Sequence, residues 1–167
     1  GVADFFFVLL YYVFPYRKKV VLGNLKSAFP EKSEQEINTI ARKFYRHFCS
    51  IMVESIKAFT ITNENLLAHF KITNTDMLEK YYVQNRSVIL VTGHYGNWEW
   101  AALTLALQSK YQASGLYQPI SNKFFDNIMQ KTRSKNGLIL IPPKETGEYF
   151  IKLKDRLVAY GFIADQS

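Results

Sequence analysis

From residue 87 onward the chain alternates short apolar runs with amphipathic segments, and this alternation limits the folds that it can adopt. Four strands are predicted at the apolar runs 88–92, 112–117, 138–141 and 157–164. The helices between them are predicted at 98–107, 121–135 and 146–154. Strands that alternate with helices form a mostly parallel sheet with right-handed crossovers. We therefore predict the α/β class, a mostly parallel sheet with flanking helices.

The segment before this pattern predicts further helices. Residues 16–29 have a helical pattern that ends before Pro30, and Ser33 with Glu36 three residues later is a capping box that opens a long helix. A short strand is predicted at 70–72 and a short helix at 75–84. The only cysteine, Cys49, lies in the long helix, where we expect an inert, buried thiol.

The first residues predict a membrane anchor. Residues 2–14 are almost all apolar, although this run is shorter than the roughly 20 residues that span a bilayer. The basic cluster 17–19 follows at once, as in an anchor whose positive end faces the cytoplasm. A buried amphipathic helix with a solvated basic end is the alternative. We divide the chain into a membrane-anchor remnant (1–16), an N-terminal helical region (17–86) and an α/β core (87–167) whose C-terminal part is expected to be absent.

The net charge of +7 and the pI of about 9.4 suggest an anionic partner: nucleic acid, anionic lipid or a phosphorylated substrate. Nucleic acid is not expected, because the basic residues are scattered and no phosphate loop, RNA-recognition signature or zinc pattern occurs. One cysteine excludes an intramolecular disulfide and is typical of a reducing compartment.

His94 and Glu99 lie on the turn between the first predicted strand and its helix. The carboxyl ends of strands are where open α/β sheets hold reactive groups. With Asn97 as N-cap, Glu99 falls in the first helical turn, and its carboxylate could accept a hydrogen bond from His94. The second imidazole nitrogen would then be free to act as a general base. The alternative is an ordinary turn histidine beside an ordinary helix-start carboxylate. His-x4-Glu lacks the paired histidines of a zinc-protease helix, so we expect no metal.

The residues around this turn resemble a known family. Residues 93–99 resemble the His-x4-Asp/Glu signature of the bacterial lipid A biosynthesis (late) acyltransferases, which belong to the lysophospholipid acyltransferase-like superfamily. Further matching segments cover almost the whole chain, in this order: Asn24-Leu25, 28–31, Glu54, 117–122, Arg133 with Gly137, and Asp165-Gln166. The occurrence of these segments in this order is specific to the family.

The resemblance implies an O-acyltransferase that moves a fatty acyl chain from acyl carrier protein, or from acyl-CoA, to a hydroxyl of a lipid A precursor. It implies His94 as the general base, oriented by Glu99, and no cofactor besides the acyl donor. Arg133 is a candidate for binding substrate, with a solvated helix residue as its alternative. Asp165 is a second candidate, with an Asx-turn residue as its alternative. Asn97 and Asn122 complete the candidate substrate-binding residues.

The resemblance further implies acyl carrier protein and a membrane lipid as partners, at the cytoplasmic face of the cell inner membrane. An enzyme of the same superfamily with another acceptor is the main alternative, because the motif does not encode whether a glycerophospholipid, a glycolipid or an amino-acid lipid is acylated. A non-catalytic membrane scaffold is a third possibility, which the presence of both His94 and Glu99 disfavours.

Overall fold

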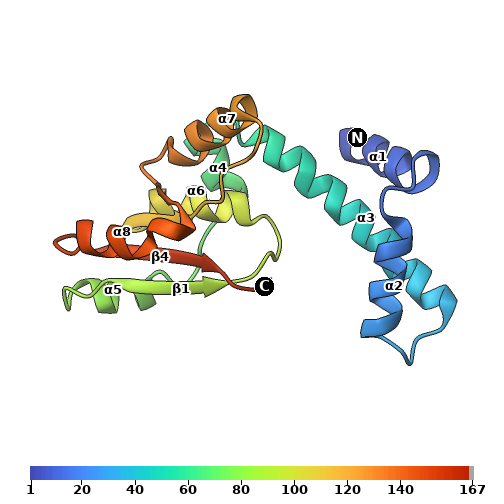
Figure 1. Cartoon of the computed structure of the whole chain (residues 1–167), viewed down its shortest axis with the longest axis horizontal. Coiled ribbons are helices and arrows are strands. Elements are labelled where there is room, and N and C mark those ends of the chain that lie inside the picture. The colour runs from blue at the N-terminus through green and yellow to red at the C-terminus, as the bar shows by residue number, and fades with distance from the viewer. Residues whose placement is uncertain (166–167) are drawn as a thin grey trace. The chain divides into compact units, whose positions relative to one another are not determined.

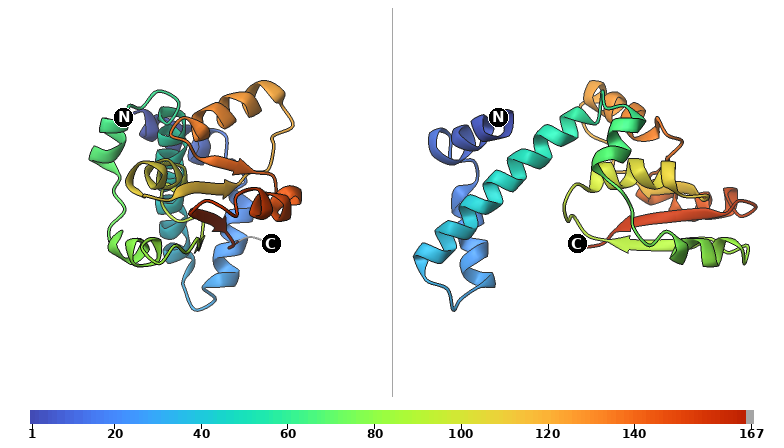
Figure 2. Two further views of the ribbon diagram at one scale, coloured as in Figure 1. Left: turned by 90° about the vertical axis from the view of Figure 1, so that its left-hand side faces the viewer. Right: turned by 180° about the vertical axis from the view of Figure 1, so that it is seen from behind.

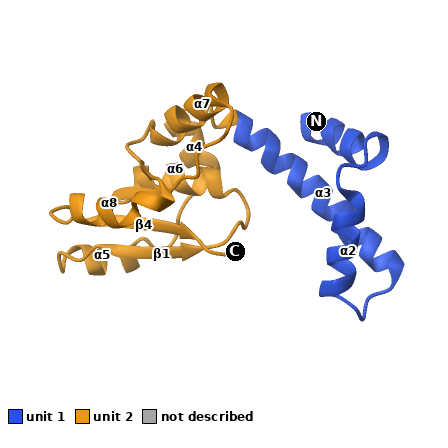
Figure 3. Ribbon diagram, viewed as in Figure 1, with its two compact units in different colours: residues 1–56 blue, residues 57–167 orange. Residues whose placement is uncertain are grey.

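A computed structural model describes residues 1–165 of the chain. These residues form two compact units, one of residues 1–56 and one that begins at Lys57. Figure 3 colours the two units separately, and each is described by itself below.

The first unit is helical, as predicted. It contains α1 (Val2–Val8), a π-helical turn (Leu9–Val13), α2 (Lys18–Ala28) and most of α3 (Glu34–Lys57). Its core is formed by Phe7 and Tyr11 packed against Tyr45 and Cys49 of α3. Cys49 is fully buried, and burial raises the pKa of its thiol, which confirms the prediction of a buried cysteine.

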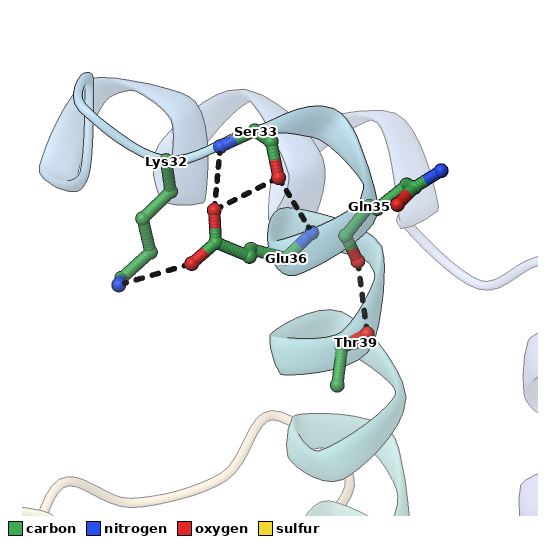
Figure 4. A network of polar contacts seen from close by, with 5 residues as sticks. All are labelled: Lys32, Ser33, Gln35, Glu36 and Thr39. Atoms are coloured by element: carbon green, nitrogen blue, oxygen red, sulfur yellow. Dashed lines mark hydrogen bonds and ion pairs between the residues drawn. The ribbon is translucent and has the colours of Figure 1, made fainter.

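The predicted capping box begins α3. The backbone N–H of Glu36 donates to Ser33 Oγ (3.3 Å), and the backbone N–H of Ser33 donates to Glu36 Oε2 (2.9 Å; Figure 4). The Ser33 hydroxyl donates to the same carboxylate oxygen (2.8 Å). These contacts satisfy backbone donors that a helix start otherwise leaves without partners.

Two short helices open the second unit, the first packed on α6 (Trp98–Gln108) and the second on the core cluster beside the sheet. They are α4 (Asn63–His69) and α5 (Asp76–Tyr82). Leu66 of α4, together with Ala58 and Ile61, forms a buried cluster with Trp100 and Leu103. Residues 57–86, which we assigned from the sequence to the N-terminal helical region, therefore pack with the α/β core.

The predicted strand at 70–72 is wrong. The segment has no strand pairing, and the backbone N–H of Ile72 donates instead to the side-chain Oε1 of Gln108 (2.8 Å). Phe70 and Ile72 pack their apolar side chains against the two neighbouring core clusters. These two residues are therefore apolar because a connecting segment packs them against the core, and not because they belong to a strand.

The sheet confirms the predicted fold class. It consists of β1 (Val88–Thr92), β2 (Gln112–Leu116), β3 (Ile139–Ile141) and β4 (Val158–Ile163). All neighbours are parallel, and the strand order is β1-β4-β2-β3. The last strand in the chain thus lies between the first and the second.

Helices cover both faces of this sheet (Figures 1 and 2). Helix α6 (Trp98–Gln108) contributes Leu105 to the cluster that contains Ala159 of β4, whereas Val158 and Tyr160 of β4 pack beside α8 (Thr146–Lys152). Successive residues of a strand face opposite sides, so α6 and α8 lie on opposite faces. Helix α7 (Lys123–Ser134) connects β2 to β3, and a short 3-10 turn (Pro143–Glu145) precedes α8.

Among residues 1–165, no helix combines the length and the apolar character that a bilayer span requires.

Candidate active site

His94 and Asp165 meet at the carboxyl edge of the sheet, where β1 and β4 end side by side. The backbone N–H of Ala164 donates to Thr92 O (2.9 Å), which extends the pairing of β1 with β4 to this edge. The backbone N–H of His94 donates to Asp165 Oδ2 (2.7 Å), and His94 Nδ1 lies 2.7 Å from Asp165 Oδ1. One carboxylate therefore holds both the backbone and the ring of His94.

This contact determines what the imidazole can do. The backbone N–H and the ring of His94 lower the pKa of Asp165, so at neutral pH this carboxylate is ionised and can only accept hydrogen bonds. In the neutral form of the imidazole, Nδ1 then carries the proton that it donates, and Nε2 has a free lone pair. The His94 ring also packs edge-to-face on Trp98, with 5.1 Å between ring centroids. About one third of the His94 side chain is exposed, so a substrate can reach it.

Gly93 leaves the space that Asp165 occupies. A Cβ on Gly93 would lie 2.9 Å from Asp165 Oδ2 and 3.2 Å from its Cγ. The carboxylate could not keep its position against that methyl group. Because Gly93 has no side chain, it admits the carboxylate of Asp165, which lies two residues after the end of β4.

Gly93→Ala is therefore expected to displace Asp165 and lower catalytic activity by about tenfold, since small misplacements of reacting groups are costly. Gly147→Ala is the matched control, because nothing lies within 4 Å of a Cβ built on Gly147. The measurement is the steady-state rate, for both variants, of the acyl transfer that the resemblance of the motifs implies. Equal activity of the two variants would show that the close approach at Gly93 does not matter.

Glu99 does not contact His94 as the sequence predicted. Arg133 Nε donates to Glu99 Oε2 (2.8 Å), and Arg133 Nη2 donates to Glu99 Oε1, so both carboxylate oxygens are engaged by α7. The prediction of a His94–Glu99 hydrogen bond is wrong because the first turn of α6 directs Glu99 toward α7, while β4 brings Asp165 to the histidine. Asp165, a candidate substrate-binding residue from the sequence, contacts His94, whereas Arg133 contacts Glu99.

Arg133 is also stacked on an aromatic ring that follows β2. Its guanidinium carbon lies 5.0 Å from the centroid of Tyr117. The Tyr117 hydroxyl donates to Asp126 Oδ1, which also accepts from the backbone N–H of Ile120 (2.8 Å). Burial, followed by the hydrogen bond to Asp126, raises the pKa of Tyr117 to about 12. The hydrogen bond from Tyr117 lowers the pKa of Asp126 most, followed by that from Ile120.

Sequence reasoning assigned no role to Tyr117 or Asp126. The sequence features that could have indicated a role are their positions. Tyr117 is the first residue after β2, and Asp126 lies in the first turn of α7. Neither position reveals from sequence that the two side chains meet.

The two candidate asparagines both cap helices. Asn97 Oδ1 accepts from the backbone N–H of Trp100 (3.0 Å), which confirms it as the N-cap of α6. Asn122 Oδ1 accepts from the backbone N–H groups of Phe124 (3.0 Å) and Phe125 (3.3 Å), so Asn122 caps α7, and the helix begins at Lys123 rather than at the predicted residue 121. Substrate binding by Asn97 and Asn122 stays a prediction.

We found neither a metal site nor a second general base elsewhere in the part of the chain that the structure describes. No group of three His, Cys, Asp or Glu side chains within residues 1–165 is placed to hold a metal ion. A cavity of about 480 Å³ lies at the opposite edge of the sheet, where Lys110, Gln112 and Arg156 contribute to its lining. Its lining contains no histidine or carboxylate and so offers no general base.

Comparison with known proteins agrees with the resemblance of the motifs. The sequence model described as bacterial lipid A biosynthesis acyltransferase matches residues 5–166. The lipid A biosynthesis palmitoleoyltransferase of Escherichia coli (strain K12) is 22% identical over 125 residues, which are 75% of this chain and 40% of that protein. The lipid A biosynthesis acyltransferase of Shigella flexneri matches with the same identity and coverage. The chain thus spans about 40% of the length of these relatives, and because the family model covers nearly all of it, it belongs to the bacterial lipid A biosynthesis acyltransferase family.

Proposed function

We propose that this chain carries the base of an O-acyltransferase that moves a fatty acyl group from acyl carrier protein to a hydroxyl of a lipid A precursor. The observation that carries the proposal is the contact of His94 Nδ1 with Asp165 at the carboxyl edge of the sheet, in a chain of this family. In this proposal Asp165, and not Glu99, orients the base.

The proposed chemistry follows from the state of the imidazole. A hydroxyl is a weak nucleophile until a base removes its proton, and His94 Nε2 has the lone pair for this step. The acceptor oxygen attacks the thioester carbon while its proton passes to Nε2. The tetrahedral intermediate collapses, the carbon–sulfur bond breaks, and the imidazolium returns the proton to the leaving thiolate. Asp165 stabilises the imidazolium that forms in between.

This sequence of steps needs no covalent enzyme intermediate and no cofactor besides the acyl donor. Cys49, the only thiol in the chain, lies in the core of the first unit and would not act as a nucleophile. The ester oxygen and the thiol proton are both supplied by the acceptor hydroxyl, so the reaction balances.

We place the protein at the cytoplasmic face of the inner membrane, where a lipid acceptor is available. Support comes from the apolar side chains that the first unit exposes, among them Val2, Phe5, Val13 and Phe14, each more than half exposed. The basic residues 17–19 follow them directly, as at an anionic membrane surface.

Acyl transfer by the full-length protein tests the proposal. The purified protein is given acyl carrier protein loaded with a fatty acyl thioester, together with a lipid A precursor, a glycerophospholipid or a glycolipid. Mass spectrometry of the lipids should show one added acyl chain on the lipid A precursor, with release of one carrier thiol for each ester formed. Acylation of only another lipid would favour the alternative acceptor, and absence of transfer to any of them would refute the proposal.

A further inference from the structure

The first turn of α7 exposes two phenylalanine rings on the second unit. Phe124 and Phe125 are 68% and 56% exposed, and Lys123 beside them is exposed as well. The rings contact each other edge-to-face, with 5.6 Å between their centroids. Successive residues of a helix point about 100° apart, so the two rings span a wide sector of the helix surface. The rest of the described chain leaves this sector largely uncovered.

The backbone of this turn is prepared for an apolar surrounding. A helix start leaves N–H groups without intrahelical partners, and each such group opposes entry into hydrocarbon. Here Asn122 Oδ1 accepts from the N–H groups of both Phe124 (3.0 Å) and Phe125 (3.3 Å). The backbone O of Asn122 accepts from the N–H of Asp126 (2.9 Å). The first turn can therefore approach an apolar phase without bringing free donors into it.

The charges beside the rings favour an anionic lipid surface. The carboxylate of Asp126 binds the hydroxyl of Tyr117, which is buried, and the backbone N–H of Ile120. This negative charge is thus directed into the protein, whereas the Lys123 ammonium stays in solvent. Phenylalanine beside lysine is typical of segments that lie in a membrane interface.

The size of the exposed pair disfavours a protein partner. One aromatic side chain buries about 150–250 Å² at most. Two of them therefore supply less than the roughly 800 Å² that each partner buries in a standard protein interface. A bilayer surface needs no such area or matching shape to accept two rings.

The position of this turn relates it to the reaction. Helix α7 follows β2, so the chain reaches it from the same carboxyl edge of the parallel sheet at which His94 follows β1. Tyr95, the residue after the base, is 93% exposed at this edge. An acceptor held in a bilayer has to come to this edge to meet Nε2 of His94.

We propose that Phe124 and Phe125, with Lys123 at their side, form a docking tip that enters the interface of an anionic bilayer. The tip brings the edge of the sheet that carries His94 to the surface in which the acceptor lies. It belongs to the second unit and acts in addition to the exposed apolar residues of the first unit. Its role in catalysis rests on the proposed function, whereas docking itself requires no acyl transfer.

Insertion is measured with Phe124→Trp in the full-length protein. Vesicles of phosphatidylglycerol and phosphatidylcholine with brominated acyl chains quench a tryptophan that enters the apolar layer. They should quench the emission that Phe124→Trp has in excess of wild type. Ile151→Trp is the matched control, because Ile151 is 72% exposed on α8, near the end that leads to the amino end of β4. Its additional emission should not be quenched.

Kinetics of Phe124→Ser/Phe125→Ser test the role of the tip. The KM for an acceptor embedded in these vesicles should rise about tenfold with little change in kcat, because less apolar area leaves water on docking. The KM for a short-chain, water-soluble acceptor should stay unchanged. An equal rise of both KM values would overturn the inference, since the two residues would then bind the acceptor itself.

Absence of quenching in Phe124→Trp would also overturn the inference. Shielding of the new tryptophan from iodide without vesicles would then show that another part of the full-length protein, or a second copy, covers the tip. Free access for iodide would show that the tip stays in water. Failure of the proposed function is recognised separately, because acyl transfer would then be absent although Phe124→Trp would still be quenched.

Discussion

His94→Ala is expected to lower acyl transfer by about 10²–10⁴-fold, the usual contribution of general acid–base catalysis. Among the described residues at this edge of the sheet, the His94 imidazole is the group placed to accept a proton. Asp165 binds its Nδ1 and leaves its Nε2 available. The measurement is the initial rate of carrier-thiol release by the full-length protein at saturating acyl donor. Alanine removes no buried apolar group from the core clusters, so the variant should fold.

His47→Ala is the matched control for this experiment. His47 is exposed on α3 in the first unit, so its loss should leave the rate unchanged. If a folded His94→Ala protein turned over at a rate near that of the His47→Ala protein, another group would have to be the base.

Asp165→Asn is expected to lower the rate by about 10²-fold or more. An amide has an acceptor oxygen at one position and a donor NH2 group at the other, so it cannot replace both carboxylate oxygens that accept from His94. A donor facing Nδ1 favours the tautomer whose Nε2 carries the proton and cannot act as a base. The same exchange in a Ser-His-Asp triad costs about 10⁴-fold for this reason.

Asp155→Asn provides the comparison, because Asp155 is an exposed carboxylate in the turn before β4. Rates and Tm are measured for both variants. An Asp165→Asn protein with a normal Tm and a normal rate would remove Asp165 from the mechanism, whereas a low rate at a normal Tm is the expected result.

The strands and helices of the second unit were largely predictable because each has a strong local signal. The run at Val88–Thr92 is apolar, β-branched and followed by Gly93, and the structure has β1 with those bounds. The capping box at Ser33 marks the start of α3 in the same local way. By contrast, α4 was not predicted, although Thr62 caps it by accepting from the backbone N–H of Asn65 (3.3 Å).

The pairing of the site residues was not predictable from local signals. His94 and Glu99 are close in sequence, which favoured a contact between them. Which strand lies beside β1 depends on the sheet order, and sequence alone does not give that order. Because β4 lies between β1 and β2, it brings Asp165 to His94, although the two residues are 71 positions apart in the sequence. Glu99 instead pairs with Arg133. Gln166, the other member of the predicted Asp-Gln motif, lies outside the described residues.

A double-mutant cycle on kcat/KM tests most directly whether His94 and Asp165 work as one unit. The cycle compares wild type, His94→Ala, Asp165→Asn and the double variant, all in the full-length protein. Residues that act together are strongly non-additive, so the double variant should be no slower than His94→Ala alone. If the two losses instead multiplied, Asp165 would act independently of the imidazole, and the account of an Asp165-oriented base would be contradicted.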